Sequence, residues 1–205
     1  MDGSPPAGPT DAAISARTDA YFNRTRAIVQ RFGDVRVTYA VFLRRPVVSA
    51  PRLAVEFLEG VARERGTRFE IELMHPEGTW VGAGDPLLYL TGSFVELSDL
   101  ETLYLQKLGP PCVAAHNAYQ MCVELPEVAF LAMDARHCAG AEMANMMAYA
   151  ASVGGDPSMV FPFAYSAARA GSDGAAMRRA FSSSAIRKAS SSDCSAFSRG
   201  SQKVW

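Results

Sequence analysis

The sequence predicts a mixed α/β protein, because its apolar residues recur with two different periods. Several segments alternate apolar and polar residues as strands do, and others carry apolar residues three and four positions apart as helices do. Near the middle, a short apolar strand at residues 128–132 leads into a helix of small residues at 140–153. A strand followed at once by a helix is typical of the α/β class.

The composition is that of a globular protein with a real core. Of the 205 residues, 49% are hydrophobic and 20% are charged. The formal net charge of −1 argues against a nucleic-acid partner, which would favour a basic excess. No apolar run approaches the roughly 20 residues that span a bilayer, and residues 1–10 lack the basic start and apolar stretch of a secretory signal. We therefore expect a cytoplasmic protein with no membrane partner.

Neither the cysteines nor the histidines have the spacing of a zinc site. No C-x-x-C or H-x-x-x-H pair occurs among the four cysteines and three histidines. Reduced thiols in a cytoplasmic protein explain the cysteines better, and we expect no metal held by a motif of this chain.

In the first half of the chain we expect a disordered leader, two helices and two strands. A proline at the first turn of a helix and a glycine just past its end are boundary signals, and β-branched or alternating residues mark strands. The expected elements are the leader at residues 1–16, a helix at 20–32, a strand at 35–42, a helix between Pro51 and Gly66, and a strand at 69–73.

The second half begins with a predicted β-hairpin over residues 80–92, whose tight turn is rich in glycine. A phosphate-binding loop is excluded there, because no Lys-Ser or Lys-Thr follows and the next element is a strand. Ser98 and Glu101 form a predicted capping box that starts a helix. We expect that helix to halt at Gly109-Pro110-Pro111 and a further helix to occupy 112–123.

Beyond Gly154 the composition changes. Ten of the 35 residues from 171 to 205 are serine, and large apolar residues become sparse. Such a segment cannot bury enough apolar surface to offset the entropy lost on ordering it. We therefore predict a low-complexity or disordered tail over residues 156–205.

The strongest candidate for a binding residue is Arg136. It follows the apolar strand, within Met133-Asp134-Ala135-Arg136-His137-Cys138. In barrels and open α/β sheets, ligands are held at the carboxyl ends of strands, where loops vary over a rigid base. A guanidinium at such a place forks onto a carboxylate or a phosphate. A surface arginine paired with Asp134 is the alternative.

Four further stretches follow one another in a characteristic order. They are Arg17-Thr18-Asp19-Ala20-Tyr21, the hairpin at 80–92, residues 97–118 with Leu100-Glu101-Thr102-Leu103, and residues 130–155. They look like a T-D-x-Y element, a G-x-G-E/D-P-L hairpin, the helix after it, and an F-G-x-R-R strand followed by an alanine-rich helix. In this order of motifs the chain resembles nicotinate phosphoribosyltransferase and, more broadly, the type II phosphoribosyltransferases.

The resemblance implies an α/β N-terminal domain packed on an incomplete α/β barrel. On this chain the N-terminal domain would be residues 17–126, and residues 127–155 would supply the first strand and helix of the barrel. Members of the family are far longer than 205 residues. They carry further barrel strands, which nothing after Gly155 matches. We therefore expect an incomplete chain, such as a truncation or a frameshift produces.

The activity that the resemblance implies is the transfer of phosphoribose to nicotinate. Nicotinate and 5-phosphoribosyl 1-diphosphate would give nicotinate mononucleotide and diphosphate in NAD salvage. Mg²⁺ and ATP hydrolysis are implied by the family and not by a motif of this chain, and the family also implies a homodimer. Catalysis of this kind is mostly positioning and charge stabilisation. Whether the incomplete chain is an active enzyme stays open.

The resemblance assigns five candidate substrate-binding residues. Arg136 matches the first arginine of F-G-x-R-R and would hold a carboxylate or a phosphate. Tyr21 matches a tyrosine that the neighbouring subunit contributes to stack on the pyridine ring, with a core tyrosine as the alternative. Asp19 lies in the same element and is either a polar site group or a helix cap. Asp134 and His137 stand where the family has a glycine and a second arginine.

These departures leave other functions open. Asp134 brings a negative charge beside an anionic substrate, and His137 is mostly neutral at pH 7, which puts the choice of nicotinate in doubt. Quinolinate phosphoribosyltransferase shares the hairpin but needs a more cationic pocket for two carboxylates. A non-catalytic fragment that only dimerises is a hypothesis of a different class, and its exposed barrel edge would favour aggregation.

Overall fold

The computed structural model describes residues 8–128, 130–155 and 160–162. All of these residues belong to one compact unit within Met1–Ala164. Along the chain its elements alternate between helices and strands, which confirms the predicted α/β class. No helix of this described part is long and apolar enough to cross a membrane.

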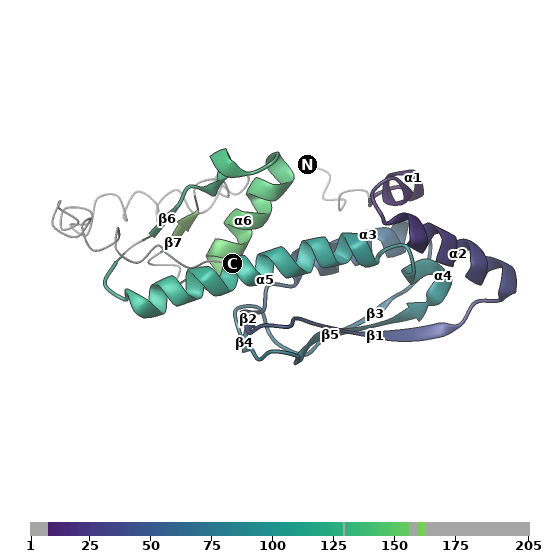
Figure 1. Ribbon diagram of the computed structural model, residues 1–205, viewed down its shortest axis with the longest axis horizontal. Helices are drawn as coiled ribbons and strands as arrows, with labels where there is room; N and C mark the ends of the chain where they lie inside the picture. The colour runs from purple at the N-terminus through teal and green to yellow at the C-terminus, as the bar shows by residue number, and fades with distance from the viewer. Residues whose placement is uncertain (1–7, 129, 156–159, 163–205) are drawn as a thin grey trace, which may run out of the picture. The chain divides into compact units, whose positions relative to one another are not determined.

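The centre of the unit is an antiparallel sheet with the strand order β1-β5-β3 (Figure 1). Its strands are β1 (Arg36–Phe42), β5 (Pro86–Ser93) and β3 (Glu70–Leu73). Successive side chains of a strand point to opposite faces, so one face is buried and the other meets solvent. On the exposed face, the hydroxyls of Thr38 and Thr91 lie 2.7 Å apart across the β1–β5 pair.

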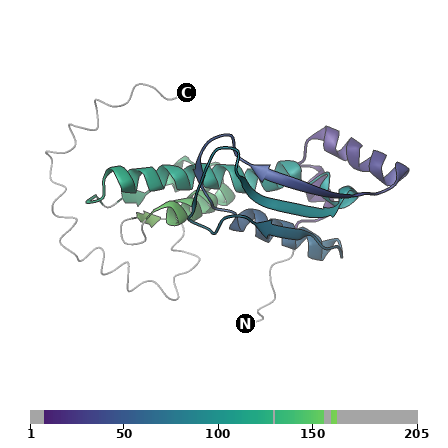
Figure 2. The same ribbon diagram turned by 90° about the horizontal axis from the view of Figure 1, so that it is seen from below.

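Two helices run along this sheet and contact each other (Figures 1 and 2). They are α3 (Arg52–Glu64) and α5 (Glu101–Glu124). The buried side chains of α3 recur three and four positions apart, as the sequence predicts for a helix with one apolar face. These residues are Ala54, Phe57, Leu58 and Val61.

Helix α5 continues where the sequence predicts a break. Pro110 and Pro111 lie inside it, so the expected halt at this point is wrong. Each proline removes one helical N–H donor, which normally disrupts a helix interior. Here buried side chains on both sides of the prolines, including Leu108 and Cys112, fasten the two halves to the same core. Tertiary packing therefore outweighs the local cost of the prolines.

The predicted capping box at Ser98 and Glu101 is also wrong. The residue before α5 is Leu100, and no side chain caps that helix. Instead, Ser93 caps the short helix α4 (Phe94–Leu97), where its hydroxyl accepts a hydrogen bond of 3.3 Å from the Glu96 amide. Ser98 is buried at the end of α4, so it has a different environment from the one that its spacing suggests.

The N-terminal part is more ordered than the sequence predicts. Within the expected leader, residues 8–16 include helix α1 (Asp11–Ser15), which Thr10 caps and which buries Ile14 completely. Burial of that one large side chain offsets the ordering of a segment rich in proline and glycine. The next helix, α2 (Ala20–Phe32), confirms the prediction at both ends.

The expected hairpin strands form, but they do not pair with each other. Strand β4 (Trp80–Val81) pairs with β2 (Val47–Val48), whereas β5 pairs with β1 and β3. The tight turn between β4 and β5 is present. Gly84 has a φ of +82° there, which favours glycine.

The barrel-like part consists of one strand–helix–strand unit. Strand β6 (Phe130–Ala132) leads through the 3₁₀ helix η1 (Asp134–His137) into helix α6 (Ala141–Gly154) and then to β7 (Val160–Pro162). Strands β6 and β7 pair in parallel, as a crossover through a helix allows.

This unit confirms the predicted opening of an incomplete α/β barrel. Strand β7 lies within the segment expected to be a tail, so that expectation is wrong for 160–162. The rest of the predicted tail, at 156–159 and 163–205, lies outside the described residues.

Helix α6 crosses α5 at very short range. A Cβ atom added at Gly154 would lie 1.7 Å from the carbonyl oxygen of Ala115 and 2.7 Å from its Cα. No side chain fits such a gap, so glycine is required for packing here. By contrast, the nearest neighbour of a Cβ at Gly109, also in α5, is Leu43 Cδ2 at 3.9 Å.

We expect Gly154→Ala to lower the free energy of unfolding by about 3 kcal/mol, because the backbones of α5 and α6 would have to separate. The matched control is Gly109→Ala, whose added methyl group would make only an ordinary contact with Leu43 and which should change stability by less than about 1 kcal/mol, because the helix-propensity gain is partly offset by the proline that follows. Denaturant unfolding measures both values. Equal effects of the two substitutions would contradict the close crossing.

Candidate functional site

Arg136 lies where the sequence places it, at the carboxyl end of a strand. It is exposed on η1, directly after β6, and its Nη2 lies 3.6 Å from Met133 Sδ. His137 follows on η1 and is also exposed. Asp134 opens η1, and its side chain lies outside the described part, so its predicted role stays a prediction. This end of the strand therefore presents one cation and one imidazole to solvent.

Tyr21 and Asp19 lie on a second surface, at the start of α2. Tyr21 is 57% exposed, and none of the residues of α2 is buried, so the alternative of a core tyrosine is wrong. The Tyr21 and Phe22 ring centroids are 4.0 Å apart. Asp19 occupies the N-cap position but makes no side-chain cap bond. Its Oδ2 accepts a hydrogen bond of 3.0 Å from Thr102 Oγ1 instead.

The sequence reasoning missed two members of this second surface. Thr102 bonds Asp19, and the neighbouring Glu101 is close enough to affect its charge state. Burial and then the charge of Asp19 raise the pKa of Glu101. Partial desolvation and then the carboxylates of Glu101 and Asp19 raise the pKa of Tyr21. Leu100-Glu101-Thr102-Leu103 was the available signal, but the capping-box interpretation assigned Glu101 a purely local role.

The two surfaces belong to different elements, the start of α2 and η1. Among the described side chains, no hydrogen bond or ion pair joins Asp19 or Tyr21 to Arg136 or His137.

A buried ion network anchors α2, and with it Tyr21. Arg65 forms a forked pair with Asp99, at 3.0 Å and 2.8 Å, and both side chains are almost fully buried. Arg26 of α2 joins the same carboxylate at 3.2 Å. Arg65 also reaches Asp11 of α1 at 2.8 Å. Burial opposes the charge on Arg65, but the hydrogen bonds and charges of Asp99 and Asp11 outweigh it and raise the pKa of Arg65.

Helix α6 is anchored near its start by a second, more exposed group of charges. Glu142 pairs with Lys107 of α5 and, at 3.5 Å, with Arg17. The hydrogen bond from Lys107 is the main cause that lowers the pKa of Glu142. The beginning of α6, a few residues after Arg136, is thereby tied to the N-terminal part.

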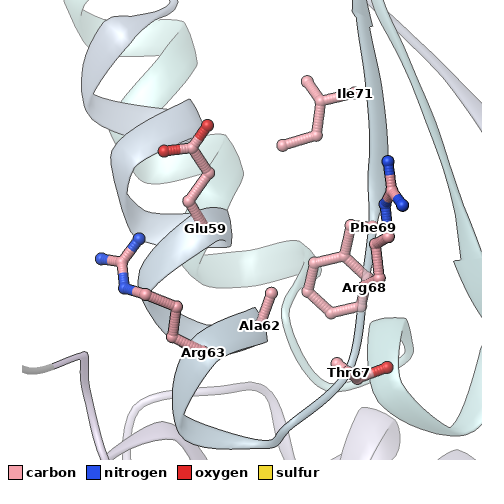
Figure 3. Close-up of a pocket in the computed structure, with 7 residues that line it drawn as sticks. All are labelled: Glu59, Ala62, Arg63, Thr67, Arg68, Phe69 and Ile71. Atoms are coloured by element: carbon pink, nitrogen blue, oxygen red, sulfur yellow. The ribbon is translucent and has the colours of Figure 1, made fainter.

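Two described cavities lie away from the predicted site residues. One, of about 610 Å³, lies between α3, α5 and α6, with Lys107 and Glu142 in its wall. The other, of about 250 Å³, lies between α3 and β3 (Figure 3). Figure 3 shows Phe69 and Ile71 of the strand side facing Glu59 and Ala62 of the helix. Neither cavity is lined by any of the five predicted binding residues.

No protein-family model matches the sequence, and no curated protein matches it. Solved structures do match. The nicotinate-nucleotide pyrophosphorylase of Pyrococcus furiosus has a TM-score of 0.58 and 24% identity, and that of Francisella tularensis has 0.52 and 13%. Human nicotinic acid phosphoribosyltransferase has a TM-score of 0.56 and 21% identity.

These similarities define the class of fold. The described unit has the fold of the type II phosphoribosyltransferases, as the four sequence motifs predict, but the comparisons do not single out one member. The alignments cover 76%, 74% and 68% of this chain, and 40%, 55% and 35% of the Pyrococcus, Francisella and human chains. The chain thus spans about half, or less, of these structures, in agreement with an incomplete barrel.

The resemblance also implies Mg²⁺ and ATP. In the described part of the chain, no three His, Cys, Asp or Glu side chains gather as they do around a metal ion.

We expect Asp99→Ala to destabilise the protein by about 3–5 kcal/mol, because it would leave Arg65 charged and buried without its main partner. The matched control is Arg36→Ala, which breaks the exposed Arg36–Glu70 pair, where both side chains are at least 60% exposed. That change should cost less than about 1 kcal/mol. Chemical denaturation compares the two, and similar costs would argue against a buried network.

Proposed function

We propose that this protein is a nicotinate phosphoribosyltransferase homologue that acts in NAD salvage. The observation that carries the proposal is Arg136, an exposed guanidinium on η1 at the carboxyl end of β6, in a unit with the type II phosphoribosyltransferase fold. The carboxyl end of a strand is where such folds hold ligands. Nicotinate carries a carboxylate, and 5-phosphoribosyl 1-diphosphate carries phosphates, so either substrate suits a guanidinium.

In the proposed reaction, the ring nitrogen of nicotinate forms a bond with C1 of the ribose. The C–O bond to diphosphate breaks at the same carbon, and the electron pair leaves with the diphosphate. Arg136 would orient an anionic group by two parallel hydrogen bonds, and His137 would add a donor or acceptor beside it. Their contribution is positioning and charge stabilisation, which supply most of the catalysis in such transfers.

We further propose that the complete site forms in a homodimer. Among the described side chains, no hydrogen bond or ion pair joins Tyr21 or Asp19 to Arg136, and Tyr21 is exposed. In a two-fold dimer, the α2 surface of each copy can face the η1 surface of the other. Tyr21 would then stack on the pyridine ring bound at the partner subunit's arginine, with Asp19 as a polar neighbour.

The incomplete barrel is expected to limit the activity of this chain. The described residues supply one strand–helix–strand unit of a barrel, and the chain spans 35–55% of the three solved chains above. We expect the 205-residue chain to bind nicotinate but to release no diphosphate from phosphoribosyl diphosphate by itself, in a cytoplasmic setting. Clear release of diphosphate in the presence of nicotinate, ATP and magnesium would contradict the expectation that the chain is inactive by itself.

A quinolinate phosphoribosyltransferase-like enzyme is the second candidate. The favouring observation is that two of the three solved structures above are nicotinate-nucleotide pyrophosphorylases, another name for that enzyme. A dicarboxylate needs more positive charge than Arg136 alone supplies. Binding of quinolinate in preference to nicotinate would favour this candidate. Dimerisation without binding of either pyridine would favour a non-catalytic fragment.

We expect Arg136→Ala to weaken nicotinate binding at least about tenfold, because it removes a charge-assisted hydrogen bond to the carboxylate. The matched control is Arg44→Ala, which removes another exposed arginine that lies outside both surfaces. Titration calorimetry measures the dissociation constants. If Arg136→Ala binds as tightly as the unchanged protein, the site does not lie at the end of β6.

We expect Tyr21→Ala and Arg136→Ala to complement each other when they are mixed. In a mixed dimer, one site combines the intact tyrosine of one copy with the intact arginine of the other. Random exchange of subunits should therefore restore about a quarter of the nicotinate sites. The baseline is the nicotinate binding of each variant measured alone. If subunits are shown to exchange and the mixture still binds no more than this baseline, Tyr21 does not serve the partner's site.

A further inference from the structure

Tyr149 of α6 is buried, with 1% of its surface exposed, yet its hydroxyl is engaged with two other elements. It donates a hydrogen bond of 2.5 Å to Glu77 Oε2 and accepts one of 3.2 Å from the Arg52 amide. Burial, then the hydrogen bond to Glu77 and the charge of that carboxylate, raise the pKa of Tyr149. The hydroxyl therefore keeps its proton and acts as the donor to Glu77.

The two partners belong to the N-terminal part of the fold. Glu77 lies in the loop between β3 and β4, and Arg52 is the first residue of α3. The guanidinium carbon of Arg52 lies 4.3 Å from the centre of the Tyr149 ring, and its Nε lies 3.9 Å from Glu77 Oε2. A cation over an aromatic face is attracted by the ring electrons. Tyr149, Glu77 and Arg52 thus form one cluster that links α6, α3 and the β3–β4 loop.

This cluster acts on the C-terminal half of α6, whereas Glu142 pairs with Lys107 and Arg17 near its start. The helix is therefore fastened to the N-terminal part at two places along its length. Between η1 and α6 only Cys138, Ala139 and Gly140 intervene. A tilt or slide of α6 would move η1 with it, because so short a connection cannot absorb a large displacement.

We propose that Tyr149 is a positioning residue that, through its hydrogen bond to Glu77, holds α6 and thereby η1 with Arg136 in register with the N-terminal part. The position of Arg136 matters only under the proposed function, and in that respect the inference rests on it. The order of η1 can be measured in the protein without any ligand. A tyrosine that only filled the core would need no hydroxyl, and phenylalanine would serve equally well.

The test is hydrogen–deuterium exchange of the whole chain, read by mass spectrometry on peptides covering residues 134–147. The reference peptides cover β1 and β5. We expect Tyr149→Phe to raise exchange over 134–147 about tenfold, since losing a hydrogen bond to a charged group corresponds to roughly that change in a local opening equilibrium. Exchange in the two reference strands should stay within about twofold.

Four further variants make the result specific. Glu77→Ala should reproduce the effect, whereas Glu77→Gln, which keeps an acceptor oxygen, should restore most of the protection. The double variant Tyr149→Phe/Glu77→Ala should be no worse than the more severe single variant, because both remove the same bond. Tyr119→Phe is the matched control, since Tyr119 is a partly exposed residue of α5, and it should leave exchange unchanged.

Two results would overturn the inference. One is unchanged exchange over 134–147 in Tyr149→Phe, and the other is an equal rise in β1 and β5, which would mean a general loss of stability. Because the measurement needs no nicotinate, a protein that binds no pyridine would refute the proposed function and leave this result standing. Conversely, nicotinate binding with unchanged exchange would refute only the role of Tyr149.

Discussion

The close crossing of α6 over α5 is the constraint on which the rest of the unit depends. At Gly154 the two backbones approach so closely that no side chain fits, and alanines of the same helix, including Ala148 and Ala150, are buried beside it. Small residues allow this approach, so close packing sets the spacing of the helices. Because α5 also contacts α3 and β2, the crossing links α3 and the β2–β4 pair to the strand–helix–strand unit.

Charged and polar groups reinforce this packing where elements far apart in sequence meet. Asp99 draws Arg65 and Arg26 together, Glu142 contacts α5 and the chain before α2, and Glu77 receives the hydroxyl of Tyr149. Burying charges costs solvation energy, so such contacts favour one arrangement over others more than they add net stability. The candidate site benefits indirectly, because these contacts orient α2 with Tyr21 and α6 with the preceding η1.

The predicted site residues lie on two surfaces that carry opposite charge. Arg136 and His137 present positive or neutral donors at the end of β6, whereas Asp19 and Glu101 present carboxylates beside an exposed tyrosine. Surfaces of opposite charge are electrostatically complementary to each other. The sequence motifs named four of these residues, but their separation into two groups became visible only in the fold.

The local sequence was sufficient to predict α2, α3, α6 and β1, and to place Arg136 directly after a strand. In these segments, the spacing of the apolar residues identifies the element without any distant contact. They failed where distant contacts override local signals. Pro110 and Pro111 remain helical because both halves of α5 pack on one core, and β4 and β5 pair with other strands instead of each other. The partners of Asp99 and Tyr149 lie 34 to 97 positions away. No rule based on neighbouring residues relates positions so far apart, so folding of the whole unit selects those contacts.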